Sequence, residues 1–141
     1  VYSKQIFIAL GFKSELKAML ENGKIAESIK DQTGYEIKTM DKKEHVNKIC
    51  DEIIAEINNS KAIIVDVTDG NQGAYYEAGY AHGMGIPVIF ICKDGESDNG
   101  KTYIEQAHFD TRQYRHILWK EELDLVKQLS GTIVAVLRKA K

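Results

Sequence analysis

The sequence predicts an α/β fold in which a five-stranded parallel sheet is covered by helices on both faces. Short apolar runs rich in β-branched residues alternate with segments whose apolar residues recur at helical spacing. Glycines and clusters of polar residues separate these elements, as turns do. Such an alternation requires crossover connections between neighbouring strands, which are right-handed in a parallel sheet. The strands are expected at residues 5–10, 35–40, 62–67, 87–92 and 116–119.

The five runs differ in polarity, and this indicates their places in the sheet. The runs at 5–10, 62–67 and 87–92 are nearly continuous in apolar residues, which is typical of central parallel strands buried on both faces. The run at 35–40 alternates apolar and polar residues, so we expect a more exposed strand. A strand order of 2-1-3-4-5 then gives a flavodoxin-like three-layer sandwich.

Helices are predicted between the strands and after the last one. The first begins at Ser14, which can cap it, and ends at Gly34. A kink or break is possible at Gly23, because glycine inside a helix costs ~1 kcal/mol relative to alanine. The other three helices are expected over residues 46–57, 74–84 and 123–137.

Length and composition bound the class of protein. The 141 residues fit one domain, 1–141, and 43% apolar with 28% charged residues is an ordinary soluble composition. The net charge of -2 argues against nonspecific binding to nucleic acid, and no apolar run approaches the ~18 residues of a membrane span. Cys50 and Cys92 lack the spacing of a metal site, so we expect a reduced, cytoplasmic protein with no metal and no cofactor. Because the first residue is Val rather than Met, we expect a piece of a longer chain.

In such a sheet, ligands bind beyond the carboxyl ends of the strands, where the strand order reverses. That point lies between the first and third strands, so segments 10–13 and 66–77 are expected to face the crevice, Gly11 among them. Glu77 is expected in the first turn of a helix starting near Ala74, where the helix dipole favours an ionised carboxylate. Such a group can attack an electrophile or stabilise a developing cation. It can equally serve helix stability alone.

Other residues of this stretch have two interpretations each. Asp66, at the end of the third strand, either accepts a hydrogen bond from a ligand or caps the loop 68–73. Gly70 and Gly73 permit positive φ and a close approach of ligand to backbone. Tyr76, with its neighbour Tyr75, can stack on a base, although we expect one of the two in the core.

Two further segments carry polar side chains. His82 follows Glu77 by five residues and therefore points away from it, so packing or surface exposure is the favoured interpretation. A long loop, polar at its start, is expected from Lys93 to Arg115. Asp110 belongs to a polar cluster in its last part, where it either forms a structural clamp with Arg112 or reaches over the crevice. Neither a GxGxxG sequence nor a P-loop is present, and the first strand ends without the acidic pair of a phosphoacceptor receiver domain.

The stretch from Ile63 to Cys92, IIVDVTDGNQGAYYEAGYAHGMGIPVIFIC, resembles the signature of the nucleoside 2-deoxyribosyltransferase-like superfamily. That group includes deoxynucleoside 5′-monophosphate N-glycosidases and TIR-like bacterial proteins. The resemblance extends to IFIALGF near the start and to HFDTRQYRHILW near the end. It implies a flavodoxin-like domain that cleaves or transfers an N-glycosidic bond of a small-molecule nucleotide or nucleoside. The partner would be a second copy of the chain or a fused domain.

Within this resemblance, Glu77 corresponds to the nucleophile that attacks the anomeric carbon and forms a glycosyl-enzyme, as in retaining glycosidases. Two positions depart from the family pattern. Phe7 stands where a tyrosine hydroxyl commonly orients the nucleophile, and Asn71 stands where the transferases carry an aspartate at the sugar. The loss of that charge favours a substrate with a phosphate. A further family acid corresponds to Asp51, Glu52 or Glu56, and the sequence does not choose among them.

Three functions therefore remain open. The first is an N-glycosidase or deoxyribosyltransferase in which Glu77 is the nucleophile, and Asp66 and Asn71 position the sugar or phosphate. The second is a TIR-like effector domain that hydrolyses NAD or a related nucleotide on oligomerisation. The third is a noncatalytic module that senses a nucleotide, which Phe7 favours because it lacks the hydroxyl.

Overall fold

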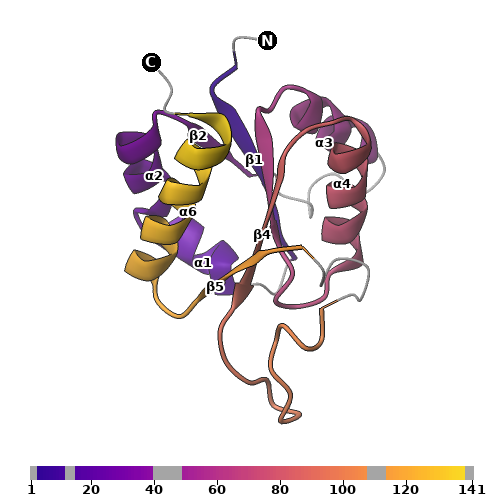
Figure 1. Ribbon diagram of the computed structural model, residues 1–141. Helices are drawn as coiled ribbons and strands as arrows, with labels where there is room; N and C mark the ends of the chain where they lie inside the picture. The colour runs from indigo at the N-terminus through magenta and orange to yellow at the C-terminus, as the bar shows by residue number, and fades with distance from the viewer. Residues whose placement is uncertain (1–2, 12–14, 40–48, 108–113, 139–141) are drawn as a thin grey trace.

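The computed structural model describes residues 3–11, 15–39, 49–107 and 114–138 (Figure 1). Strands and helices alternate along most of the chain, as expected. Their bounds are β1 Gln5–Ala9, α1 Glu15–Asn22, α2 Ile25–Thr33, β2 Glu36–Lys38, α3 Ile49–Asn58, β3 Ala62–Asp66, α4 Gln72–Gly83, β4 Val88–Lys93, β5 His116–Trp119 and α6 Glu122–Leu137.

The five strands form one parallel sheet in the order β2-β1-β3-β4-β5, which confirms the predicted fold. In the register of the two central strands, Ile8 pairs with Ile64 and Ala9 with Val65. Figure 1 shows α1, α2 and α6 on one face of the sheet and α3 and α4 on the other. The carboxyl ends of β1, β3 and β4 thus lie at one edge of the sheet, called here the carboxyl edge.

The predicted break in the first helix is present at Gly23. α1 ends at Asn22 and α2 begins at Ile25, and the Gly23 amide donates to the Met19 carbonyl. Gly34 ends α2 in the left-handed conformation, with φ 83°, and its amide donates to Lys30. Both glycines therefore act as the sequence predicts: one separates two helices and the other terminates the second.

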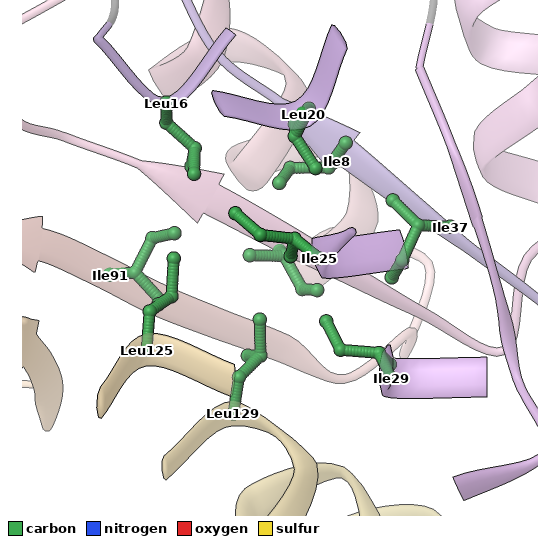
Figure 2. Close-up of a pocket in the computed structure, with 10 residues that line it drawn as sticks. Ile8, Leu16, Leu20, Ile25, Ile29, Ile37, Ile91, Leu125 and Leu129 are labelled. Carbon is green, nitrogen blue, oxygen red and sulfur yellow. The ribbon is translucent and has the colours of Figure 1, made fainter. Parts of the chain in front are cut away.

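Each face of the sheet has its own hydrophobic cluster. The cluster under α1, α2 and α6 is made mainly of branched aliphatic side chains, and Figure 2 shows them pointing toward one another from helices and strands. The space between them is too small to admit a water molecule. The cluster under α3 and α4 contains Phe7, Phe90 and the three alanines of α4, Ala74, Ala78 and Ala81.

The segment that follows β4 was expected to be a long polar loop. Its described part, residues 94–107, extends past the carboxyl edge in Figure 1 and is ordered by its own hydrogen bonds. Glu96 and Thr102 form a short antiparallel bridge, and the Gln106 amide donates to Ser97 and to the Lys101 carbonyl. Among the described residues, no helix is long and apolar enough to cross a membrane.

Candidate active site at the carboxyl edge

The loops that follow β1 and β3 meet at Gly11. A side-chain carbon built on Gly11 would lie 2.1 Å from Asp69 Oδ2 and 3.1 Å from Asn71 Cβ. A larger residue here would have to displace the Asp69 side chain, so the absence of a side chain at Gly11 lets the two loops come this close. Gly11 and the loop after β3, both expected to face the crevice, are therefore neighbours in space.

Asp66 organises the loop after β3. Its side chain is fully buried, and Oδ1 accepts hydrogen bonds from the Thr68 amide at 3.1 Å and from the Thr68 hydroxyl at 2.6 Å. The same hydroxyl oxygen accepts from the Lys93 amide at 2.9 Å. Asp66 thus performs the capping role, and Thr68 ties that loop to the end of β4.

Asn71 is the N-cap of α4, because its side-chain oxygen accepts from the Ala74 amide at 2.9 Å. This cap starts the helix at Gln72, two residues before the expected start. Two expectations are therefore wrong. Glu77 lies in the second turn, beyond the unpaired amides of the first turn, and Gly73 lies inside the helix rather than in a loop of positive φ. Gly70, with φ 64°, does have the expected conformation.

Glu77 nevertheless faces the sheet. Its residue is 3% exposed, and it lies on the same side of α4 as the buried Ala74, Ala78 and Ala81. These small side chains let the helix lie close to β1, β3 and β4, which it contacts. Phe7, 1% exposed, belongs to the same cluster from β1, so the residue at the position of the family tyrosine is near this helix and carries no hydroxyl.

The remaining residues that the sequence singled out lie in different surroundings. Tyr75 packs against the cluster under α4, whereas Tyr76 is 60% exposed, so the expectation that one tyrosine belongs to the core is met by Tyr75. His82 is exposed and contacts the Tyr114 ring edge-on, as expected for a residue pointing away from Glu77. Asp110 and Arg112 lie outside the described residues.

The three acids of α3 lie at different heights relative to the sheet. Gln5, the first residue of β1, donates through Nε2 to Glu56 Oε2 at 2.9 Å, which places Glu56 at the amino end of the sheet. α3 ends just before β3 begins, so its first turn lies toward the carboxyl edge. Asp51 and Glu52 belong to that turn. The structure therefore removes Glu56 from the candidates and leaves the other two.

Sequence reasoning missed two features of this edge. Lys93, the last residue of β4, forms an ion pair with Glu15 and thereby joins the end of this strand to the start of α1. Burial, with a smaller contribution from the charge of Asp66, raises the pKa of Cys92 to about 12, so this thiol stays protonated at neutral pH.

This geometry defines an α/β protein of flavodoxin-like topology with polar residues gathered at the switch point between β1 and β3. No family model matches the chain, and no curated protein matches its sequence. Among solved structures, CMP N-glycosidase BcmB from Clostridium botulinum is similar, with a TM-score of 0.59, 16% identity and coverage of 89% of this chain and 97% of that one. At this identity, the match shows that the two chains share a fold.

A second solved structure shares the topology. The lysine decarboxylase LdcF from Francisella novicida matches with a TM-score of 0.53 and 17% identity, over 94% of this chain and 17% of that much longer one. Decarboxylation of an amino acid and cleavage of a glycosidic bond are different reactions. The fold is therefore common to proteins with different activities, and the function has to be argued from the site.

Proposed function

We propose that this chain cleaves or transfers the N-glycosidic bond of a nucleotide or nucleoside, with Glu77 as the nucleophile. The observation that carries the proposal is the placement of Glu77: a carboxylate facing the sheet from α4, beside the switch point where ligands of this fold bind. Glutamate is seldom buried to this degree in proteins. Residues 76–79, Tyr-Glu-Ala-Gly, lie in the stretch that resembles the superfamily, and they support the same chemistry, as does the similarity to a CMP N-glycosidase.

The proposed reaction has two steps. A Glu77 oxygen attacks C1′ of the pentose, and the C1′–N bond breaks with its electron pair leaving on the base, which takes up a proton. Water, or a second base in a transfer reaction, then attacks C1′ from the opposite side, releases the carboxylate and gives up its proton. Asp66 and Asn71 hold the adjoining loop in place, since their side chains fix the backbone at residues 68 and 74.

We further propose that the substrate carries a phosphate. Asn71 is neutral where transferases acting at the sugar carry an aspartate, so a phosphate meets less repulsion there. The similar protein BcmB is a CMP N-glycosidase, and CMP is a nucleoside monophosphate. Gly11, Gly73, Tyr76 and Asp110 remain proposed binding residues around this position.

The test measures base release by chromatography from CMP, dCMP and the matching nucleosides. Glu77→Gln keeps the size of the side chain but removes the nucleophilic charge, so we expect kcat to fall at least 10³-fold, an effect of about 4 kcal/mol. Glu27→Gln, an equal change at an exposed position of α2, is the control and should leave the rate unchanged. Undiminished release by Glu77→Gln would remove Glu77 from the mechanism.

A noncatalytic nucleotide sensor is the second candidate, and Phe7 favours it. A buried phenyl ring near α4 cannot donate the hydrogen bond that commonly orients the nucleophile. Calorimetric titration with CMP and dCMP would then show tight binding with no base released over many hours. Incubation with NAD at high protein concentration, followed for nicotinamide, tests the TIR-like alternative in the same series.

A further inference from the structure

A groove of about 490 Å³ lies at the opposite end of the sheet from the candidate active site. It crosses the amino ends of β4 and β5, where Pro87, Val88 and Ile117 line it, and it reaches from His82 near the end of α4 to Val136 near the end of α6. Its volume falls within the range of roughly 300–1,000 Å³ that small-molecule sites occupy. A five-residue strand spans roughly 16 Å, so this groove is separate from the carboxyl edge.

One wall of the groove is aromatic and held in place. The Tyr114 ring lies nearly parallel to Phe90, with centroids 5.8 Å apart and planes at 21°, and meets the His82 ring edge-on at 5.6 Å. The Tyr114 carbonyl is 2.8 Å from His116 Nδ1, and the His116 ring stacks on Phe90 at 5.0 Å. Tyr114 is still 41% exposed, so part of its ring is available to a ligand.

The charge of the groove is one-sided. None of the described residues that line it is acidic, although acids outnumber bases in the whole chain, 21 to 19. Arg115 contributes a guanidinium group and His82 an imidazole. Within the part of the chain that the structure describes, Arg115 forms no ion pair. The aliphatic side chains of the lining, such as Ile86, Val88 and Val136, are called here the aliphatic floor.

We propose that this groove is a second ligand site, which takes a planar aromatic anion. The ring of the ligand lies against Tyr114 and the aliphatic floor, and its carboxylate, sulfonate or phosphate group pairs with Arg115, whose planar fork suits such anions. The site is independent of the proposed glycosidic chemistry. Its ligand touches the end of α4, the helix that also carries Glu77.

The probe is 8-anilinonaphthalene-1-sulfonate, titrated into the folded protein and followed by its fluorescence and by calorimetry. We expect one molecule bound per chain, and at least tenfold weaker binding of 1-anilinonaphthalene, which lacks the sulfonate. Arg115→Met should weaken binding of 8-anilinonaphthalene-1-sulfonate at least tenfold, because it removes the guanidinium charge and retains an unbranched side chain in its place. Lys127→Met is the matched control: an exposed cation of α6 that does not line the groove, whose loss should leave the affinity unchanged.

A second variant tests the position of the ring. Val136→Phe fills the groove from α6 at a half-exposed position, so the protein should fold and binding of the sulfonate should be lost. Thermal unfolding of each variant confirms that the comparison is made between folded proteins. Affinities within twofold of the unaltered protein for both Arg115→Met and Val136→Phe, or equal affinity for the uncharged naphthalene, would overturn the proposal.

Discussion

The two faces of the sheet are packed by different kinds of residue. Under α1, α2 and α6, large branched side chains such as Leu16, Ile29 and Leu129 fill the space completely. Under α4, the helix presents Ala74, Ala78 and Ala81 to the sheet. The two faces therefore differ in the size of the side chains that separate the helices from the sheet.

The aliphatic face contributes mainly to folding stability, and the alanine face carries the carboxylate for which we propose a chemical role. The aliphatic face buries the larger helix side chains, and burial of apolar surface is the dominant favourable contribution to folding. On the alanine face, Glu77 is the single charged side chain that is buried on a helix among the described residues. The alanine face thus packs with smaller side chains and holds the Glu77 carboxylate against the sheet.

Truncation on the aliphatic face should have the largest effect on stability. Leu129→Ala leaves a cavity in a tightly packed cluster whose side chains can fill it only in part. We therefore expect the free energy of unfolding to fall by about 2–5 kcal/mol. Urea unfolding measures this loss, with an unchanged m-value. Leu123→Ala on the same helix is the control, because Leu123 is 82% exposed and its loss should change stability by less than about 0.5 kcal/mol. Equal effects of the two changes would contradict the assigned core.

Enlargement on the alanine face tests whether close packing matters there. Ala78→Leu should push α4 away from the sheet and cost about 1–3 kcal/mol of folding free energy. If Glu77 is the nucleophile, the variant should also lose most base release under conditions where it remains folded. Gly79→Ala is the neighbouring control: its added carbon meets nothing within 4 Å, so a gain of about 0.5–1 kcal/mol is expected.

Alkaline pH should destabilise the alanine face through Cys92. Burial raises the pKa of this thiol from 9.0 to about 12, so the folded protein retains a proton that the unfolded chain releases above pH 9. The free energy of unfolding should therefore fall as pH rises from 9, by up to about 1.4 kcal/mol per pH unit. Urea unfolding at pH 8, 9 and 10 measures the slope, and Cys92→Ala should reduce it. An identical slope in the variant would assign the effect to other groups.

The smallest effect is expected for the ion pair between Glu15 and Lys93. Both side chains are partly exposed, and water screens their attraction, so Glu15→Gln should cost no more than about 1 kcal/mol. Denaturation at low and at high salt measures the pair, since the difference between variant and unaltered protein should shrink at high salt. A loss comparable with that of Leu129→Ala would mean that charge, rather than burial, holds α1 to the sheet.

The fold could be predicted from the sequence because its signals are local. Helical spacing of apolar residues, continuous apolar runs for buried strands and the terminating Gly34 each depend on neighbours within a few residues. The positions around the crevice were also accessible, because the switch point of a 2-1-3-4-5 sheet follows from strand order alone. The start of α4 was missed because a side chain, that of Asn71, outweighs the turn-forming residues around it.

By itself, the sequence determined the class of fold and the order of the strands, and it predicted that the loops after the first and third strands face a ligand. Only the tertiary structure decided that Gly11 lies against Asp69 and that Lys93 pairs with Glu15. It also decided that Glu56 lies at the amino end of the sheet, and that a groove lined by Arg115 crosses the same end. The physical reason is distance along the chain. Periodicity records contacts between near neighbours, whereas these contacts join residues dozens of positions apart, and their geometry exists only once the strands have paired.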